Sequence, residues 1–213
     1  MTTHRPRGLT SEKVRARYDR LASLYDFMEA PMERRFGDWR RRLWAEVRGP
    51  AVLEVGVGTG ANIPFYPEGM RVTAIDLSPR MLAWARRRAS RAGVPVDLRL
   101  MDAEHLEFED DTFDSAVATC VFCSVADPVA GLREMGRVTR PDGRIVLLEH
   151  VRPQGALGRV ADLLNPVVVR LIGPNINRPT VENVRRAGLE IERIDAFLHD
   201  IVRLIVARPG KPG

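Results

Sequence analysis

Glycine occupies three alternate positions directly after an apolar run, in the stretch VLEVGVGTG at residues 52–60. Because glycine has no Cβ, such a loop can turn sharply and bring its backbone close to a ligand. Asp76 follows the next apolar run, 20 residues beyond Gly56, and a carboxylate at this spacing can accept hydrogen bonds from both hydroxyls of a ribose. A glycine loop alone is a weak signal, but the two features together predict a site for a ligand that contains a ribose.

Histidine and cysteine supply the other candidate reactive groups. His150 ends an apolar run, and an imidazole titrates in the range that suits a general base, although a lone histidine is more often structural. Cys120 and Cys123 lie within the apolar run TCVFCSV, which favours small buried residues at the end of a strand over a redox pair. No second pair of cysteines or histidines completes a zinc site, so we expect no metal.

Short apolar runs alternate with helical segments from residue 51 onward, which predicts a parallel sheet with helices on both faces. These runs span residues 51–57, 71–77, 96–101, 113–125 and 144–151. Between them we expect helices at 79–92, entered through Ser78 and Pro79, and at about 128–139, ended by the turn at 141–143. The last two runs, at 189–198 and 201–209, are joined too closely for a helix and must form an antiparallel hairpin. The sequence thus predicts an α/β, Rossmann-like fold with a seven-stranded, mostly parallel sheet.

Two predicted helices precede this core, at residues 11–29 and 32–48, with Pro31 between them. The second is amphipathic, because several arginines stand opposite an apolar stripe formed by Met32, Phe36, Trp39, Leu43 and Val47. Such a stripe can cover the core of its own domain, or it can enter the headgroup region of an anionic membrane. The two alternatives differ in whether Phe36 and Trp39 are buried.

The length of 213 residues suits one α/β domain and is short for two. We expect a single domain over residues 1–213, with a helical cap at 11–48, a cofactor-binding core at 51–151, an insert at 153–180, and a C-terminal helix and hairpin at 181–209. No apolar run approaches the ~20 residues that cross a bilayer, and no secretory signal is evident, so we expect a cytoplasmic protein. Residues 1–50 hold 12 basic and 7 acidic residues and so carry the whole net charge of +5.

Three features of the core resemble the class I S-adenosylmethionine-dependent methyltransferases: Glu54 in the first apolar run, the sequence MDAE at 101–104, and the closing hairpin. The resemblance covers residues 11–209. It implies that the methionine part of the cofactor is held by Glu54, Gly56, Gly58, Thr59 and Gly60, and the ribose by Asp76 and Leu77. By the same resemblance, the adenine contacts Asp102 and Ala103, and the donor methyl group lies beside Cys120 and Val121. The cofactor would be covered by Tyr18 and Tyr25.

Three longer stretches, at residues 17–26, 119–151 and 171–191, are similar to the membrane-associated alkyl thiol methyltransferases. The first two also resemble the bacterial phospholipid N-methyltransferases and the quinone C-methyltransferases. This branch implies a small or lipid-like acceptor, with a thiol or a phosphatidylethanolamine-type amine, or alternatively a quinone carbon. We expect the insert to form an apolar lid over that acceptor, through Leu157, Val160, Leu163, Leu164, Val167, Val168, Leu171 and Ile172.

Nucleic acid is not an expected partner in spite of the calculated pI of 9.8. The run at 113–125 does not end in the Asn/Asp-Pro-Pro-aromatic motif that is typical of DNA methyltransferases, and aromatic and basic residues do not alternate in a way that suits base stacking. Two other classes share the glycine loop and Asp76. One is a nicotinamide-dependent dehydrogenase, for which no hydride-transfer residues are recognisable, and the other is a scaffold that binds adenosylmethionine without catalysis.

Overall fold

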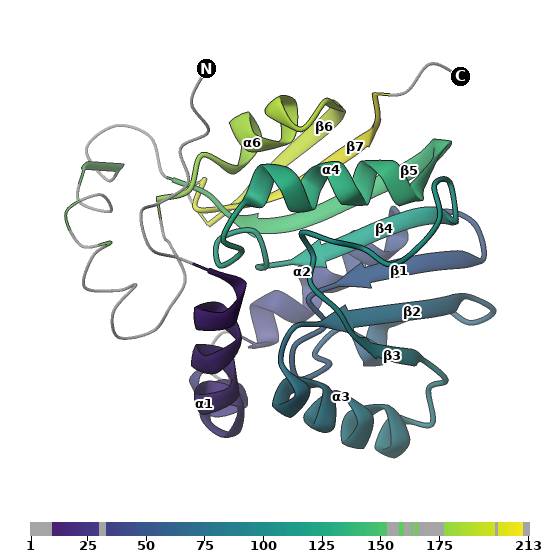
Figure 1. The fold of residues 1–213 in the computed structure, drawn as a ribbon, viewed down its shortest axis with the longest axis vertical. Coiled ribbons are helices and arrows are strands. Elements are labelled where there is room, and N and C mark those ends of the chain that lie inside the picture. Colours follow the sequence, from purple (N-terminus) through teal and green to yellow (C-terminus); the bar gives the residue numbers. More distant parts are fainter. Residues whose placement is uncertain are drawn as a thin grey trace.

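The computed structural model describes residues 10–29, 33–152, 158–159, 163, 165, 177–198 and 200–210. Its centre is a seven-stranded sheet in the order β3-β2-β1-β4-β5-β7-β6 (Figure 1). Only β7 is antiparallel to its neighbours, β5 and β6. The strands are β1 (Ala51–Val55), β2 (Arg71–Asp76), β3 (Asp97–Leu100), β4 (Phe113–Thr119), β5 (Thr139–His150), β6 (Leu189–Phe197) and β7 (Val202–Pro209). The predicted fold class and its closing hairpin are confirmed.

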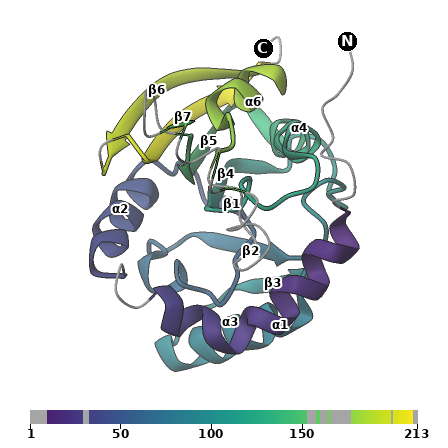
Figure 2. The ribbon, with the colours of Figure 1, turned by 90° about the vertical axis from the view of Figure 1, so that its left-hand side faces the viewer.

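Helices cover both faces of the sheet, because its central strands are apolar on both sides. α2 (Glu33–Ala45) and α3 (Pro79–Ala92) pack on one face, and α4 (Pro128–Val138) and α6 (Thr180–Arg186) pack on the other. α1 (Ser11–Glu29) lies beside α3, outside these two layers (Figure 2). One turn of 3-10 helix, η1 (Ile63–Phe65), follows the glycine loop.

Local capping explains where α3 and α4 begin. The Ser78 hydroxyl accepts a hydrogen bond from the Met81 amide at 3.1 Å, and a proline follows it at the first helical position. The Asp127 carboxylate accepts from the amides of Val129 and Ala130, both at 3.1 Å. The predicted helix at 79–92 is confirmed residue for residue, and each helix starts close to the carboxyl end of the preceding strand.

Two strand boundaries differ from the sequence prediction by five residues or more, and local contacts explain both. The apolar run at 113–125 leaves the sheet at Thr119, because Cys120 has a φ of +54° and turns the chain away from the strand direction. The Pro-Asp-Gly segment at 141–143 does not precede β5 but lies within it. Thr139 pairs with Phe113 and Arg144 with Ser115, so the residues between them form an irregularity in the ladder.

The described part of the predicted apolar stripe, on α2 and just after it, is turned toward the sheet, and Met32 lies outside the described residues. Phe36 and Val47 are each 8% exposed and Leu43 is fully buried, whereas Trp39 is half-buried and stacks on Phe197 with ring centroids 5.3 Å apart. Packing over the core, which was one of the two alternatives for this helix, is therefore what the stripe does. Arg40 also points inward and is 4% exposed.

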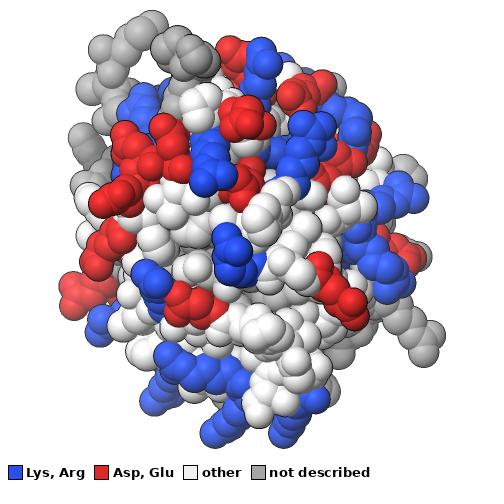
Figure 3. Space-filling view, turned by 90° about the vertical axis from the view of Figure 1, so that its right-hand side faces the viewer, with Lys and Arg blue, Asp and Glu red and all other residues white. Residues whose placement is uncertain are grey.

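Opposite charges stand side by side over much of the molecular side that faces away from α1 (Figure 3). The lower end of that side, where α3 lies, is mainly basic, with exposed Arg86, Arg87 and Arg91. Among the described residues, no helix combines the length and apolar character needed to cross a bilayer.

Most of the insert at 153–180 lies outside the described residues. This applies to seven of the predicted lid residues, namely Leu157, Val160, Leu164, Val167, Val168, Leu171 and Ile172. Leu163 is described and is 77% exposed. The side chain of Tyr25 also lies outside the described part of the chain. The lid and the division into cap, core and insert therefore stay predictions.

Candidate active site

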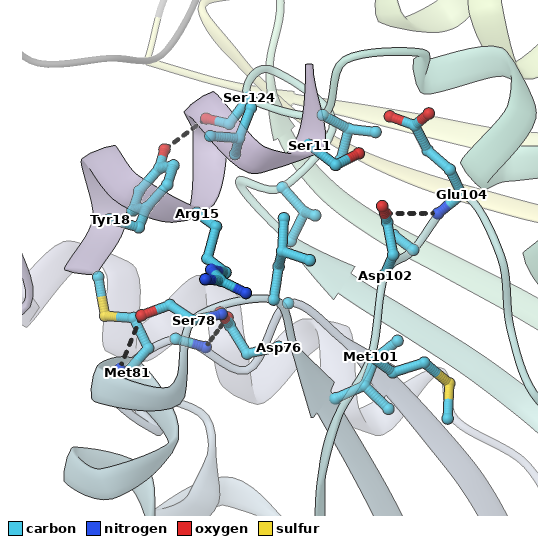
Figure 4. Close-up of a pocket in the computed structure, with 18 of the residues that line it drawn as sticks. Ser11, Arg15, Tyr18, Asp76, Ser78, Met81, Met101, Asp102, Glu104 and Ser124 are labelled. Atoms are coloured by element: carbon cyan, nitrogen blue, oxygen red, sulfur yellow. Dashed lines mark hydrogen bonds between the residues drawn. The ribbon is translucent and has the colours of Figure 1, made fainter.

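A pocket opens at the carboxyl ends of the parallel strands, beside α1 (Figure 4). Ligands bind at this edge in sheets of this kind, because the loops that leave neighbouring strands separate there. The pocket is lined by Ser11, Val14, Arg15, Tyr18, Gly56, Gly58, Ile75, Asp76, Leu77, Ser78, Met81, Met101, Asp102, Ala103, Glu104, Thr119, Cys120, Val121, Ser124, Val125 and Ala126.

The glycine loop after β1 forms one wall, and its backbone is left-handed at Gly56, Gly58 and Gly60, where φ is +70°, +56° and +86°. A Cβ at Gly56 would lie 2.4 Å from Val121 Cγ2, so only glycine fits between the loops that follow β1 and β4. A Cβ at Gly58 would meet no atom within 4 Å. The backbone at Gly58 is therefore open to a ligand.

Asp76 ends β2 and lies against this loop. Its Oδ2 accepts a hydrogen bond from the Gly58 amide at 2.9 Å, and its Oδ1 accepts from the Ser78 amide at 2.8 Å. Burial raises the pKa of Asp76 to about 6, although these amide hydrogen bonds oppose the rise. The side chain is mostly ionised at neutral pH, so it can accept hydrogen bonds from a ribose.

The segment after β3 forms the opposite side of the pocket. Asp102 Oδ1 accepts a hydrogen bond from the Glu104 amide at 3.0 Å (Figure 4), and Glu104 Oε1 accepts from the Asp127 amide at 2.8 Å. These bonds hold the backbone of Asp102 and Ala103 in place. Met101 and Ala103 add an apolar surface to the same wall, which suits a flat base.

Glu54 lies behind the pocket and not in its lining. It is 1% exposed, its Oε1 accepts a hydrogen bond from Asn62 Nδ2 at 2.6 Å, and its Oε2 accepts from the Tyr66 hydroxyl. Arg40 completes this buried group by donating to Asn62 Oδ1 at 2.8 Å. Burial raises the pKa of Glu54. Because both of its oxygens already have partners, Glu54 acts on the pocket through Asn62, which also donates to Thr119 Oγ1 at 3.0 Å.

Most of the sequence-predicted cofactor residues meet at the pocket. Those in its lining are Tyr18, Gly56, Gly58, Asp76, Leu77, Asp102, Ala103, Cys120 and Val121. Glu54, Thr59 and Gly60 lie outside the lining, since the first two are buried and Gly60 faces Ile63 and Ala85. Among the described residues, no group of three or more potential ligands could hold a metal ion.

α1 contributes pocket residues that sequence reasoning missed. Ser11 and Arg15 share a face of α1 with Tyr18, and the Arg15 side chain extends toward Asp76 (Figure 4). Their helical spacing from Tyr18 is a signal that could have identified them. Ser124 was also missed, and its Oγ lies 2.5 Å from the Tyr18 hydroxyl. The Ser78 hydroxyl donates to Asp19 Oδ1 at 2.5 Å, which fixes α1 on the start of α3.

His150 lies behind Cys120, which forms part of the pocket wall. Its Nδ1 is 3.4 Å from Cys120 Sγ, and its ring centroid is 6.0 Å from that of Phe36. Burial lowers the pKa of His150, so the imidazole is neutral at physiological pH and can accept a proton. Cys120 stands between His150 and the pocket, and neither Cys120 nor Cys123 forms a disulfide.

Comparison with known proteins identifies the family of this chain. Residues 53–147 match the model of the methyltransferase domain family. A human thiol S-methyltransferase is 32% identical over an alignment of 177 positions, and the match covers 72% of this chain and 68% of that protein. The chain belongs to the class I S-adenosylmethionine-dependent methyltransferases. The predicted family and its methyl donor, S-adenosylmethionine, are thereby confirmed.

Two further comparisons define how far the likeness reaches. A phosphatidylethanolamine N-methyltransferase of Cereibacter sphaeroides is 45% identical over an alignment of 130 positions, and the match covers 59% of this methyltransferase and 64% of that protein. This chain spans less than two thirds of the length of several of the relatives that it matches. The crystal structure of the [4+2]-cyclase SpnF superposes with a TM-score of 0.76 at 19% identity, over 94% of this chain and 97% of that one, and so shares the fold.

Proposed function

We propose that this methyltransferase transfers a methyl group from S-adenosylmethionine to the thiol or amine of a small or lipid-like apolar acceptor. The observation that carries the proposal is the division of the pocket into two chemically distinct sides. The polar groups that suit a nucleoside, Asp76 and Asp102, follow β2 and β3, whereas uncharged side chains, Val121 and Val125, follow β4. In this arrangement Gly58 and Asp76 hold the methionine and ribose parts, and Asp102 and Ala103 bind the adenine.

The chemical step needs little beyond positioning, because the sulfonium already activates its methyl group. The acceptor's lone pair forms a bond to the methyl carbon while the carbon–sulfur electron pair moves to sulfur, which leaves S-adenosylhomocysteine. The acceptor then loses its proton. We assign His150 as the group that accepts this proton. Cys120 lies between His150 and the pocket, with its Sγ 3.4 Å from His150 Nδ1.

The acceptor class is suggested by the relatives. The relative with 45% identity is a phosphatidylethanolamine N-methyltransferase, and a human thiol S-methyltransferase is also similar. We therefore rank a phosphatidylethanolamine-type amine first and an alkyl thiol second. The test is transfer of labelled methyl from S-adenosylmethionine to phosphatidylethanolamine in mixed micelles, to a medium-chain alkyl thiol and to a demethylated prenylquinone. Label on the quinone alone would select the C-methyltransferase alternative.

A scaffold without methyl transfer is the outcome that would contradict the proposal altogether. The likeness to SpnF shows that a protein of this fold can be described as a cyclase, so the fold alone does not prove transfer. Binding of S-adenosylhomocysteine together with no labelled product from any of the three acceptors would reject the proposed reaction. A dehydrogenase is tested in the same calorimetric experiment by adding NAD, which we expect not to bind.

The tyrosines of α1 and the insert at 153–180 complete the proposal. Tyr18 and Tyr25 would close over the cofactor, and the insert would cover the acceptor side. Support comes from α1, which already contributes Val14 and Tyr18 to the pocket lining.

Peripheral contact with an anionic membrane at the inner face is the remaining part of the proposal. Because the apolar stripe of α2 is packed on the core, this contact would be electrostatic, through exposed residues such as Arg41 and Arg42, at roughly 1 kcal/mol for each arginine. Flotation with anionic vesicles at low salt tests it. Failure to float rejects it, and loss of flotation in an Arg41→Glu, Arg42→Glu double variant that still binds S-adenosylhomocysteine supports it.

A further inference from the structure

The loop that leaves β4 forms much of the pocket wall in a conformation that needs external support. Five of its residues, Cys120, Val121, Ser124, Val125 and Ala126, line the pocket. Cys120 has a φ of +54°, in the left-handed region that is unfavourable for a residue other than glycine. Contacts from other elements must therefore hold this loop.

Glu149 on β5 supplies the main support. It is fully buried, and its Oε1 accepts hydrogen bonds from the amides of Val121 at 2.8 Å and Phe122 at 3.0 Å. The amide of Cys123 also hydrogen-bonds to this carboxylate and, like the other two, opposes the rise of its pKa. Three successive amides that converge on one carboxylate form an anion-binding nest, here occupied by a side chain of the same protein.

Arg178 holds the next part of the same loop. It is 9% exposed, and its Nη2 donates to the Val125 carbonyl at 3.0 Å. Its charge attracts Glu149 and so lowers the pKa of that carboxyl, in opposition to burial. Within the described residues, Glu149 Oε2 and Arg178 Nε are buried without a hydrogen-bond partner. A carboxylate on one side and a guanidinium on the other therefore fix residues 121–125 between them.

We propose that Glu149 is a positioning residue for methyl transfer, because its carboxylate holds the backbone of residues 121–123 and thereby places Cys120, Val121 and Ser124 at the pocket. The part that concerns catalysis rests on the proposed function. The part that concerns the loop does not, and it is tested separately.

Thiol labelling tests the loop. Cys120 and Cys123 are the only cysteines, so a Cys120→Ser background leaves Cys123 as the single thiol. Cys123 is 2% exposed, its Sγ lies 3.2 Å from the Cys120 carbonyl oxygen, and burial raises its pKa to about 12. It therefore reacts with a thiol reagent only when the loop opens.

Glu149→Gln and Glu149→Leu form a matched pair in this background. Both remove the charge and so change the pKa of Cys123 in the same way, but only glutamine keeps an oxygen that can accept the three amide hydrogen bonds. We expect Cys123 to be labelled about tenfold faster or more in the leucine variant than in the glutamine variant, well below the melting temperature. Equal rates in two folded variants would overturn the proposal, whatever the activity.

The pH dependence of S-adenosylhomocysteine affinity is the second readout, and it needs only the glutamine variant. Burial raises the pKa of Glu149 to about 7, so the ionised form, which holds the amides more strongly, gains population between pH 6 and 8. The groups that face it are Cys123, Arg178 and, across the ladder on β7, Arg203, which pairs with Asp200. His150 follows it on the strand.

When Glu149 ionises, its hydrogen bonds from the loop amides become charge-assisted and it attracts Arg178. We therefore expect the affinity of the wild type for S-adenosylhomocysteine to rise relative to that of Glu149→Gln by about threefold or more between pH 6 and 8. A constant ratio would overturn the proposal. If the ratio changes and yet no acceptor is methylated, the role of Glu149 in placing the loop stands and the proposed function fails.

Discussion

The Tyr18 hydroxyl lies 2.5 Å from Ser124 Oγ, so a hydrogen bond joins α1 to the loop after β4 at the pocket. Burial raises the pKa of Tyr18, and the hydroxyl is therefore protonated throughout the physiological range. α1 is also held at Asp19, which accepts from Ser78. Hydrogen bonds at Tyr18 and at Asp19 thus fix the helix over the pocket, and the one at Tyr18 can be removed without disturbing those at Asp19.

Tyr18→Phe removes this hydroxyl and keeps the ring. We expect the affinity for S-adenosylhomocysteine to fall by about fivefold, which corresponds to the ~1 kcal/mol of one hydrogen bond. Calorimetry measures it. Ser124→Ala should have a similar effect, and the double variant should lose little more than either single variant, because both remove the same bond. Additive losses would show that the two hydroxyls act independently.

Gly56→Ala should weaken both folding and cofactor binding. The new Cβ would lie 2.4 Å from Val121 Cγ2, and the alanine would have to adopt a φ of +70°. Gly69→Ala is a matched control, because φ there is +80° but a Cβ would meet no atom within 4 Å. We expect the control to lose about 1 kcal/mol of unfolding free energy through backbone strain alone, and Gly56→Ala to lose at least ~2 kcal/mol. Denaturant unfolding compares the two.

Cofactor binding should depend on pH through Asp76. Its pKa of about 6 lies above the ordinary value of 3.8, so the unliganded protein binds a proton there more readily than the unfolded chain does. Ribose hydroxyls donate to the ionised form. Through Asp76 alone, affinity for S-adenosylhomocysteine should therefore be constant above about pH 7 and fall below pH 6, by about tenfold for each further unit, in addition to the smaller change that we assign to Glu149.

Two Asp76 variants serve as controls for this profile. Asp76→Asn should show a low affinity that lacks this steep fall and keeps only the smaller change that we assign to Glu149, and Asp76→Ala should lose about 2 kcal/mol of binding free energy at pH 7.5. A full wild-type pH profile in Asp76→Asn would assign the titration to another group.

His150→Ala should lower turnover and leave the affinity for S-adenosylhomocysteine within about twofold of the wild type, since His150 lies outside the pocket lining and, within the described part of the chain, contacts it at Cys120. Single-turnover methyl transfer and calorimetry separate the two quantities. A parallel loss of turnover and affinity would mean that His150 supports the cofactor site through Cys120 and does not serve the acceptor.

The order of apolar runs determined the sheet, because alternation of short buried strands with capped helices permits few other topologies. Ser78 and Pro79 likewise determined where α3 begins, and the types and spacing of Gly56, Gly58 and Asp76 were enough to predict the edge of the sheet at which the pocket lies. These features are local in the chain, or they depend on the carboxyl ends of parallel strands lying together. They can therefore be predicted from the periodicity and spacing of residues in the sequence.

Tertiary contacts alone decided the rest. Glu54 has a carboxylate that can accept hydrogen bonds, and it lies on the predicted strand. In the folded protein its two oxygens accept hydrogen bonds from Asn62 and Tyr66, and only tertiary packing brings these three side chains together. The stripe of α2 was compatible with a membrane or with a core until strands β5 and β7 supplied an apolar face for it to cover. Glu149 is one residue before His150 in the sequence, yet successive side chains on a strand point to opposite faces, and this places its carboxylate under the loop after β4.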